Sequence, residues 1–196
     1  MSKGLTPRFV LLTNPNNPLG VIYRPQVIKD TIEWARKRNL HTIVDEIHAL
    51  STYNTGSMAP DPFQQPHHPH PTSPSATSEG FQSVIQIMNN QLGNDVHMVW
   101  GLSKDFGASG LRVGVLYSQN ELFMRALATS NIGTFSCVSG PIQYVVSELL
   151  TDDAFIDIFL EDSRSRLRQS YEMCALNLEE MDVPFVPAEA GLFVYV

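Results

Sequence analysis

The sequence predicts an α/β fold with a mostly parallel sheet flanked by helices. Short apolar runs at 8–13 and 41–47 are rich in β-forming residues and end in turn chemistry, which is typical of buried strands. Between them, apolar residues follow helical spacing from Pro25 to about Asn39. Strand, helix and strand in this order form a βαβ unit, whose two strands run parallel.

Composition favours a globular protein of the cytoplasm. The 196 residues are 43% hydrophobic, enough for one core and the start of a second domain. A net charge of −7, without any basic run, argues against nucleic-acid partners and a membrane anchor. We find no apolar run of transmembrane or signal-peptide length. Cys137 and Cys174 form no disulfide or metal pattern, which favours a reducing compartment.

A proline-rich segment at 58–80 interrupts the fold. It holds six of the thirteen prolines and three of the six histidines, and it is predicted to be a disordered surface loop. The run HHPHP within it could suggest a metal site. Prolines interrupt the row and no cysteine or carboxylate completes a ligand set, so we expect no metal there.

The second half of the chain alternates strands with helices and then becomes helical. We expect a short helix near 81–91, strands over 96–102 and 112–118 joined by a hairpin, and helices around 122–127 and 142–150. A long amphipathic helix should run from Asp153 to about Met181. Its apolar side is expected to carry Leu160, Leu167, Tyr171, Cys174 and Leu178. The run FVPAEAGLFVYV at 185–196 resembles a strand.

The first candidate site is the corner TNPNNPLG at 13–20, directly after the first strand. Prolines restrict the backbone there, and Gly20 permits a conformation that other residues resist. Open α/β sheets bind ligands at the carboxyl ends of their strands, so an asparagine at this corner could offer a fixed hydrogen bond. A plain turn is the alternative, because asparagine and proline are common in turns.

The second candidate is IVDEIH, in which Asp45 and Glu46 end the next strand. Neighbouring side chains of a strand point to opposite faces of the sheet, so the two carboxylates cannot act as a pair on one substrate. We expect one of them to enter the site and the other to face away. A solvated strand end is the alternative.

The third candidate is WGLSKDFGASGLRVG, the most specific of the three. A lysine between two apolar strands, Lys104, is unusual for packing, and a lysine amine can form a Schiff base with a carbonyl. Eight residues later, Arg112 opens the next strand, and its guanidinium suits a phosphate. A positively charged surface hairpin is the alternative.

Together, the three stretches in this order resemble the class I/II aminotransferases, which are fold-type-I pyridoxal-phosphate enzymes. Within them they resemble most the 1-aminocyclopropane-1-carboxylate synthase-like branch. The resemblance implies that Lys104 forms a Schiff base with pyridoxal 5'-phosphate and shuttles a proton at the substrate α-carbon. It also implies that Asp45 pairs with the pyridine nitrogen, Asn17 binds the ring 3-oxygen, and Arg112 holds the phosphate with help from Ser103.

Two residues depart from the family pattern. His48 stands where a tyrosine is common as a second donor to the ring oxygen, and histidine titrates nearer neutrality. Some related carbon–sulfur lyases carry histidine there, which keeps a lyase reaction open. Gly101 stands where a phosphate-binding serine is frequent, so one phosphate contact is expected to be missing.

The resemblance also predicts a fragment of a longer enzyme. Residues 1–150 would form a partial large cofactor-binding domain, and 151–196 a linking helix and the start of a small domain. The substrate would be an α-amino acid, and the full-length parent would be a homodimer. Transamination, elimination by a lyase, and a non-catalytic truncated remnant remain as alternatives. A keto-acid product would indicate the first, and release of a sulfur-containing leaving group the second.

Overall fold

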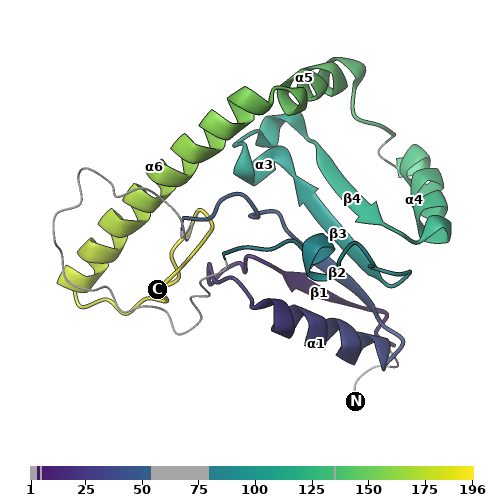
Figure 1. Cartoon of the computed structure of the whole chain (residues 1–196), viewed down its shortest axis with the longest axis horizontal. Helices are drawn as coiled ribbons and strands as arrows, with labels where there is room; N and C mark the ends of the chain where they lie inside the picture. Colours follow the sequence, from purple (N-terminus) through teal and green to yellow (C-terminus); the bar gives the residue numbers. More distant parts are fainter. Residues whose placement is uncertain (1–3, 5, 54–79, 135) are drawn as a thin grey trace.

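A four-stranded sheet in the order β1-β2-β3-β4 lies at the centre of the molecule (Figure 1). The computed structural model describes residues 4, 6–53, 80–134 and 136–196. The strands are β1 (Phe9–Thr13), β2 (His41–Asp45), β3 (Val96–Gly101) and β4 (Gly114–Ser118). Strand β2 pairs parallel with both β1 and β3, whereas β4 runs antiparallel to β3. The predicted α/β fold with a mostly parallel sheet is therefore confirmed.

Helices surround this sheet and extend away from it. They are α1 (Pro25–Arg36), α2 (Val84–Ile87), α3 (Leu102–Asp105), the 3₁₀ helix η1 (Ser109–Leu111), α4 (Glu121–Thr134), α5 (Gly140–Thr151) and α6 (Asp153–Glu180). Helix α1 runs beside the β1 end of the sheet, and α6 crosses to the opposite side of the molecule (Figure 1). None of the helices in the described ranges combines the length and the apolarity needed to span a bilayer.

The core lies between one face of the sheet and the two helices α1 and α2. Helix α1 begins with Pro25 at its first turn, and its inward side buries Ile28, Ile32 and Ala35. Ile28 and Ile32 form one cluster with residues of β2, α2, β3 and the connection between α2 and β3, namely Val44, Val84, Ile87, Leu92 and Val96. The βαβ unit thus forms as its apolar spacing predicts, but the expectation that its first strand is buried was wrong. No residue of β1 is fully buried, because only Leu12 packs against this core and the opposite face of the strand is uncovered.

The opposite face of the sheet is open at β1. Phe9 and Leu11 point to that face and are 56% and 57% exposed. By register, Leu11 lies beside Ile43 of β2, and Thr13 lies beside Asp45. Asp45 is therefore on the open face of the sheet, away from the α1–α2 core.

Several elements differ from the expectation. The helix expected at 81–91 is reduced to α2, because Asn89 and Asn90 adopt left-handed backbone angles of 50° and 58° in φ and end it. The strand expected over 41–47 ends at Asp45, and 185–196 contributes only isolated bridges. Of the segment predicted to be a disordered loop, residues 58–79 lie outside the described residues.

Helix α6 extends from Asp153 to Glu180, as predicted, but its buried side is narrower than expected. Ala175 is its buried residue, whereas Cys174 is exposed. The placement of Cys174 on the apolar side was therefore wrong. The other four residues expected on that side, Leu160, Leu167, Tyr171 and Leu178, are half-buried. Hydrophobic spacing marks a side of a helix, but it does not show which positions on that side another element covers.

A pair of histidines, the exposed His41 and the buried His97, links β2, β3 and β4. His97 is buried, its Nε2 lies 2.8 Å from Nδ1 of His41, and its Nδ1 lies 2.7 Å from Oγ of Ser118. Phe123 of α4 packs on its ring, with 4.5 Å between the centroids. Burial and the neighbouring His41 lower the pKa of His97, while Asp95 acts in the opposite direction.

We expect this histidine to make the protein less stable in mild acid. Since the pKa of His97 is lower in the folded chain than in the unfolded chain, protonation favours unfolding, and stability falls as the pH drops below the unfolded value of about 6.5. Urea unfolding between pH 7.5 and 5 should show that the free energy of unfolding falls more steeply with decreasing pH in the wild type than in His97→Gln. Parallel curves for the two proteins would contradict this role.

Candidate functional site

The carboxyl ends of β1, β2 and β3 meet at one edge of the sheet. The amide of Asn14 donates to the carbonyl of Asp45 at 2.9 Å, and the amide of Glu46 donates to the carbonyl of Val99 at 2.9 Å. The amide of Leu102 in turn donates to the carbonyl of Val113 at 3.3 Å. These bonds place the Asn-Pro corner, the Asp45–His48 turn and the Lys104 turn side by side.

The Asn-Pro corner is a compact turn held by its own asparagines. Oδ1 of Asn14 accepts from the amide of Tyr23 at 2.9 Å, and Nδ2 of Asn16 donates to the Tyr23 hydroxyl at 3.0 Å. The peptide bonds before Pro15 and Pro18 are cis. Asn17, the residue predicted to bind the cofactor, is exposed on this corner.

A segment near the C-terminus covers the corner. The carbonyl of Gly20 accepts from the amides of Glu189 and Ala190 at 2.8 and 3.0 Å. The buried carboxylate of Glu189 accepts from the amide of Ile22 at 3.1 Å. Parts of the chain that are far apart in sequence are therefore joined at this edge of the sheet.

Asp45 and Glu46 point to opposite faces of the sheet, as predicted. Glu46 is buried on the core side, where its Oε1 accepts from the amide of Val84 at 2.6 Å and caps the start of α2. Burial raises the pKa of Glu46, although the bond to Val84 opposes this shift. Asp45 is half-buried on the open face, and its Oδ1 accepts from the amide of Ile47 at 3.1 Å. Asp45 is thus the carboxylate available to the site.

His48 is buried at the same edge with one ring nitrogen unsatisfied. It is 2% exposed, and its Nδ1 has no hydrogen-bond partner in the described part of the chain. The ring of Phe193 meets it edge-on, with 5.3 Å between the centroids. Burial lowers the pKa of His48; the charge of Lys104 lowers it further, whereas Asp105 and Asp45 raise it. His48 follows Asp45 by three residues, and the segment that carries it is hydrogen-bonded to Asp105, the neighbour of Lys104.

Lys104 lies on α3 and not in the simple hairpin that was expected. Strands β3 and β4 do pair antiparallel, but α3 and η1 form the connection between them. The lysine side chain is exposed, Ser103 is half-buried, and Asp105 is buried. A short helical turn therefore presents the amine to solvent at the strand ends.

Arg112 follows η1 and leads into β4. Its backbone is left-handed, with φ 56° and ψ 41°, and its Nη1 donates to the carbonyl of Ser109 at 3.1 Å. The side chain is exposed. Gly101 pairs with Gly114 across the two strands, so Arg112 and Lys104 belong to the same β3–β4 connection.

Two further polar groups at this edge were missed by the sequence analysis. Asn14 is fully buried, and its Nδ2 has no partner in the described residues. Asp105 is buried and accepts three hydrogen bonds. The sequence signal for Asp105 was its spacing of three from the apolar Leu102, which places both on one side of a helical turn.

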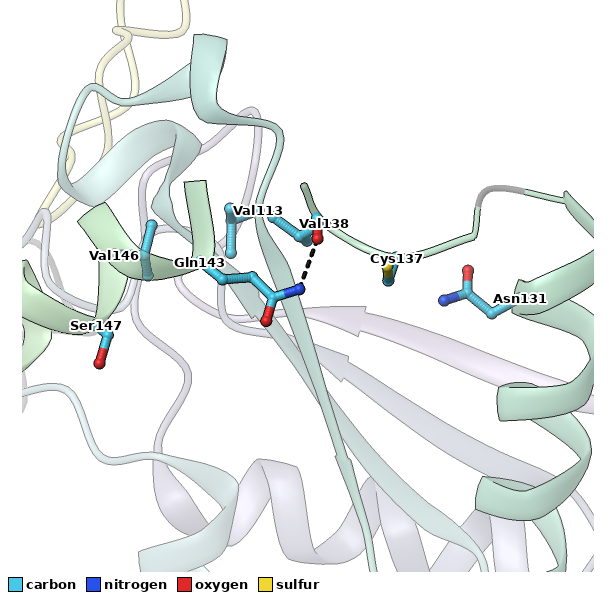
Figure 2. Close-up of a pocket in the computed structure, with 7 residues that line it drawn as sticks. All are labelled: Val113, Asn131, Cys137, Val138, Gln143, Val146 and Ser147. Atoms are coloured by element: carbon cyan, nitrogen blue, oxygen red, sulfur yellow. Dashed lines mark hydrogen bonds between the residues drawn. The ribbon is translucent and has the colours of Figure 1, made fainter. Parts of the chain in front are cut away.

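A cavity of about 380 Å³ lies beside this edge rather than in it (Figure 2). Its lining comes from the residue before β4, from α4 and α5, and from the segment between these helices: Val113, Asn131, Cys137, Val138, Gln143, Val146 and Ser147. Nε2 of Gln143 donates to the carbonyl of Val138 at 2.6 Å across it. None of the lining residues is a predicted site residue.

Comparison with known proteins gives matches over the whole chain. The family model for aminotransferase class I and II matches residues 2–196. The chain is 31% identical over 196 residues to 1-aminocyclopropane-1-carboxylate synthase-like protein 1 of Bos taurus, covering 100% of this chain and 34% of that protein. It is 33% identical over 196 residues to 1-aminocyclopropane-1-carboxylate synthase 6 of Oryza sativa subsp. japonica, covering 98% and 32%.

A human relative and a bacterial structure add to this. The chain is 32% identical over 195 residues to the "Probable inactive 1-aminocyclopropane-1-carboxylate synthase-like protein 2" of Homo sapiens, covering 99% of this chain and 30% of that protein. A double mutant of aspartate aminotransferase from Thermus thermophilus has the same fold, with a TM-score of 0.76 and 19% identity over 97% of this chain and 43% of its own. The chain thus spans about a third of the length of its curated relatives. The chain belongs to the aminotransferase class I and II family, and its fold is that of part of a fold-type-I enzyme.

Proposed function

We propose that this chain is the lysine-bearing part of a pyridoxal-phosphate enzyme that acts on an α-amino acid through a Schiff base at Lys104. The observation that supports it most is the meeting of three strand ends, which gathers Lys104, Asp45 and His48 at one edge of the sheet. Open α/β sheets bind their ligands at this edge. The family match, over nearly the whole chain, supports the same chemistry.

The residues at this edge fit the cofactor. The buried Nδ1 of His48 has no partner in the described residues, so a ring oxygen could satisfy it. The half-buried carboxylate of Asp45 can pair with a protonated ring nitrogen, and the exposed guanidinium of Arg112 can bind phosphate together with the Ser103 hydroxyl. Asn17 is proposed to reach the ring oxygen from the corner. Each group offers the charge or donor that its part of the cofactor requires.

The chain's own residues would divide the work as follows. Bound pyridoxal phosphate supplies an electron sink that stabilises negative charge at the substrate α-carbon. The amine of Lys104 would hold the cofactor covalently, and once the substrate amine had displaced it, the free amine would move the proton at the substrate α-carbon. Asp45 keeps the ring nitrogen protonated, and His48 donates to the ring oxygen. Arg112 and Ser103 fix the phosphate and so hold the ring in place.

Transamination and elimination share these residues, and a lyase remains a second candidate. His48 keeps it open, because some related carbon–sulfur lyases carry histidine where the aminotransferase pattern commonly has tyrosine. The relatives include both a synthase and a protein named "Probable inactive", so a chain without catalytic activity is the other alternative. We also propose that the longer protein of which this chain is a part lies in the cytoplasm and forms a homodimer.

Covalent trapping tests the proposal at a single residue. The sequence holds four lysines, at positions 3, 29, 37 and 104. After incubation with pyridoxal phosphate and reduction with borohydride, we expect peptide mass spectrometry to find the pyridoxyl group on Lys104. Lys104→Arg should lower the incorporated label by about tenfold or more, because the amine of the Schiff base is lost.

Lys37→Arg is the matched control. Lys37 follows α1 and is exposed, so its replacement should leave the label on Lys104 unchanged. Equal labelling of Lys29, Lys37 and Lys104 in the wild type would contradict a specific pocket at this edge of the sheet.

A further inference from the structure

Asp105, the residue after the predicted Schiff-base lysine, is one of the few buried carboxylates described. It is 4% exposed. Its Oδ2 accepts from the amide of Leu50 at 3.1 Å and from Nε1 of Trp100 at 2.7 Å, and its Oδ1 accepts from the hydroxyl of Ser51 at 2.7 Å. Three hydrogen bonds therefore hold this carboxylate in place, and hydrogen bonds to a charged acceptor are stronger than those between neutral groups.

These donors come from two neighbouring parts of the site. Trp100 belongs to β3, whereas Leu50 and Ser51 belong to the segment that leaves β2 and also carries His48. The Asp105 carboxylate therefore ties the turn that carries Lys104 to the turn that carries His48. No other hydrogen bond of a described side chain of α3 makes this connection.

The same contact sets the rotation of α3. Leu102 and Asp105 lie three positions apart, on one side of the helical turn, and both are buried. Lys104 is turned by about 100° from Asp105 around the helix and is exposed. If the carboxylate were free, Leu102 would still anchor this four-residue helix by apolar packing, but the hydrogen bonds that orient the lysine turn relative to the His48 turn would be lost.

Helix α6 joins the same network. Nε of Arg164 donates to the carbonyl of Leu50 at 3.0 Å, on the peptide group next to the one that binds Asp105. The segment around Leu50 is thus held by α6 from one side and by α3 from the other. The charge on Asp105 also raises the pKa of His48, whereas burial and the charge of Lys104 lower it.

We propose that Asp105 is a positioning residue that locks the Lys104 turn onto the segment following β2, so that the amine and the His48 ring face one cofactor. We call the hydrogen bonds from Asp105 to Leu50 and Ser51 the lock. The lock is a property of this chain, whereas its purpose, the orientation of Lys104 toward a cofactor, rests on the function proposed above. Two measurements separate the lock from its purpose, and only the second one uses pyridoxal phosphate.

Amide hydrogen exchange tests the lock without any cofactor. In Asp105→Ala, we expect exchange at 48–52 and at 102–105 to rise together by about tenfold, because loss of a charged acceptor frees both segments. Glu46→Ala is the matched control, since it removes a buried carboxylate that also accepts a backbone amide, on the opposite face of the sheet. It should loosen α2 and leave 102–105 unchanged. Unchanged exchange at 48–52 in Asp105→Ala would overturn the lock.

Asp105→Asn and Ser51→Ala keep the test decisive if Asp105→Ala does not fold. The asparagine retains an oxygen for Leu50 and Trp100, and its amide can donate to Ser51, so protection of both segments should stay within about threefold of the wild type. Ser51→Ala removes one donor only and should raise exchange in both segments by a smaller factor than Asp105→Ala. Unchanged protection in Ser51→Ala would also overturn the lock.

Trapping with pyridoxal phosphate and borohydride tests the purpose. We expect Asp105→Ala to lower the yield of labelled Lys104 by about tenfold, and Asp105→Asn to restore most of it. Full labelling of Lys104 in Asp105→Ala would overturn the positioning role while leaving the proposed function intact. Absence of specific label in the wild type would instead contradict the proposed function, and hydrogen exchange would then decide the lock alone.

Discussion

Gly20→Ala should destabilise the fold by about 3 kcal/mol, far more than an ordinary surface substitution. Gly20 has φ 68°, a left-handed conformation that costs a residue with a Cβ atom about 1 kcal/mol. A Cβ atom built there would lie 2.6 Å from Cβ of Ala188 and 2.8 Å from the carbonyl oxygen of Ala190. Because one of these contacts is with backbone, the C-terminal segment must move away from the Asn-Pro corner.

Gly107→Ala is the matched control for this prediction. Gly107 has φ 61°, nearly the same conformation, but nothing lies within 4 Å of the added Cβ atom. Its replacement should therefore cost only the conformational part, about 1 kcal/mol. Urea unfolding of both variants measures the difference, and equal losses would contradict the close packing of the corner.

A double substitution identifies the clash. Ala188→Gly removes the nearest atom, so Gly20→Ala combined with Ala188→Gly should recover part of the stability that Gly20→Ala loses. The carbonyl of Ala190 remains in place, which is why recovery should be incomplete. Purely additive losses would indicate that the backbone contact, and not the Ala188 methyl group, limits the approach.

The contact at Gly20 also marks what the sequence could not show. Glycine after two Asn-Pro pairs predicts a tight corner, because the turn chemistry is local. Its partners Glu189 and Ala190 lie far away in the chain, and Glu189 would be expected at the surface from its charge alone. The partner of a turn is set by the tertiary fold, and no pattern within the turn reports it.

Lys104 shows the same division between local and distant causes. Apolar runs on both sides predicted two paired strands, and the described structure contains them as β3 and β4. The helical turn between them was not predicted, because its stability depends on Leu50 and Ser51, which lie more than fifty residues earlier in the chain. Asp105 was overlooked for this reason, although the position of each predicted site residue at the strand ends followed from the motifs.

Leu102→Ala should be the second large effect, with a loss of about 3 kcal/mol in the free energy of unfolding. Leu102 is 1% exposed and begins α3, where its amide donates to Val113 and its carbonyl accepts from Ala108 at 3.1 Å. Truncation leaves a cavity under the lysine turn that the backbone cannot close without breaking these bonds. Leu122→Ala on α4 is the control, since Leu122 is 79% exposed and its loss should stay within about 0.5 kcal/mol.

Leu102→Ala also tests whether apolar packing or the buried carboxylate orients Lys104. Leu102 and Asp105 anchor one side of α3, but of the two side chains only that of Asp105 can hydrogen-bond to the segment that carries His48, and it does so at Leu50 and Ser51. Leu102→Ala should therefore lower stability while the molecules that remain folded still trap pyridoxal phosphate on Lys104 to at least half the wild-type yield, about a twofold change at most. A tenfold loss of label in the folded fraction would assign the direction of the lysine to apolar packing and not to the buried carboxylate. A stability equal to that of Leu122→Ala would contradict the burial of this anchor.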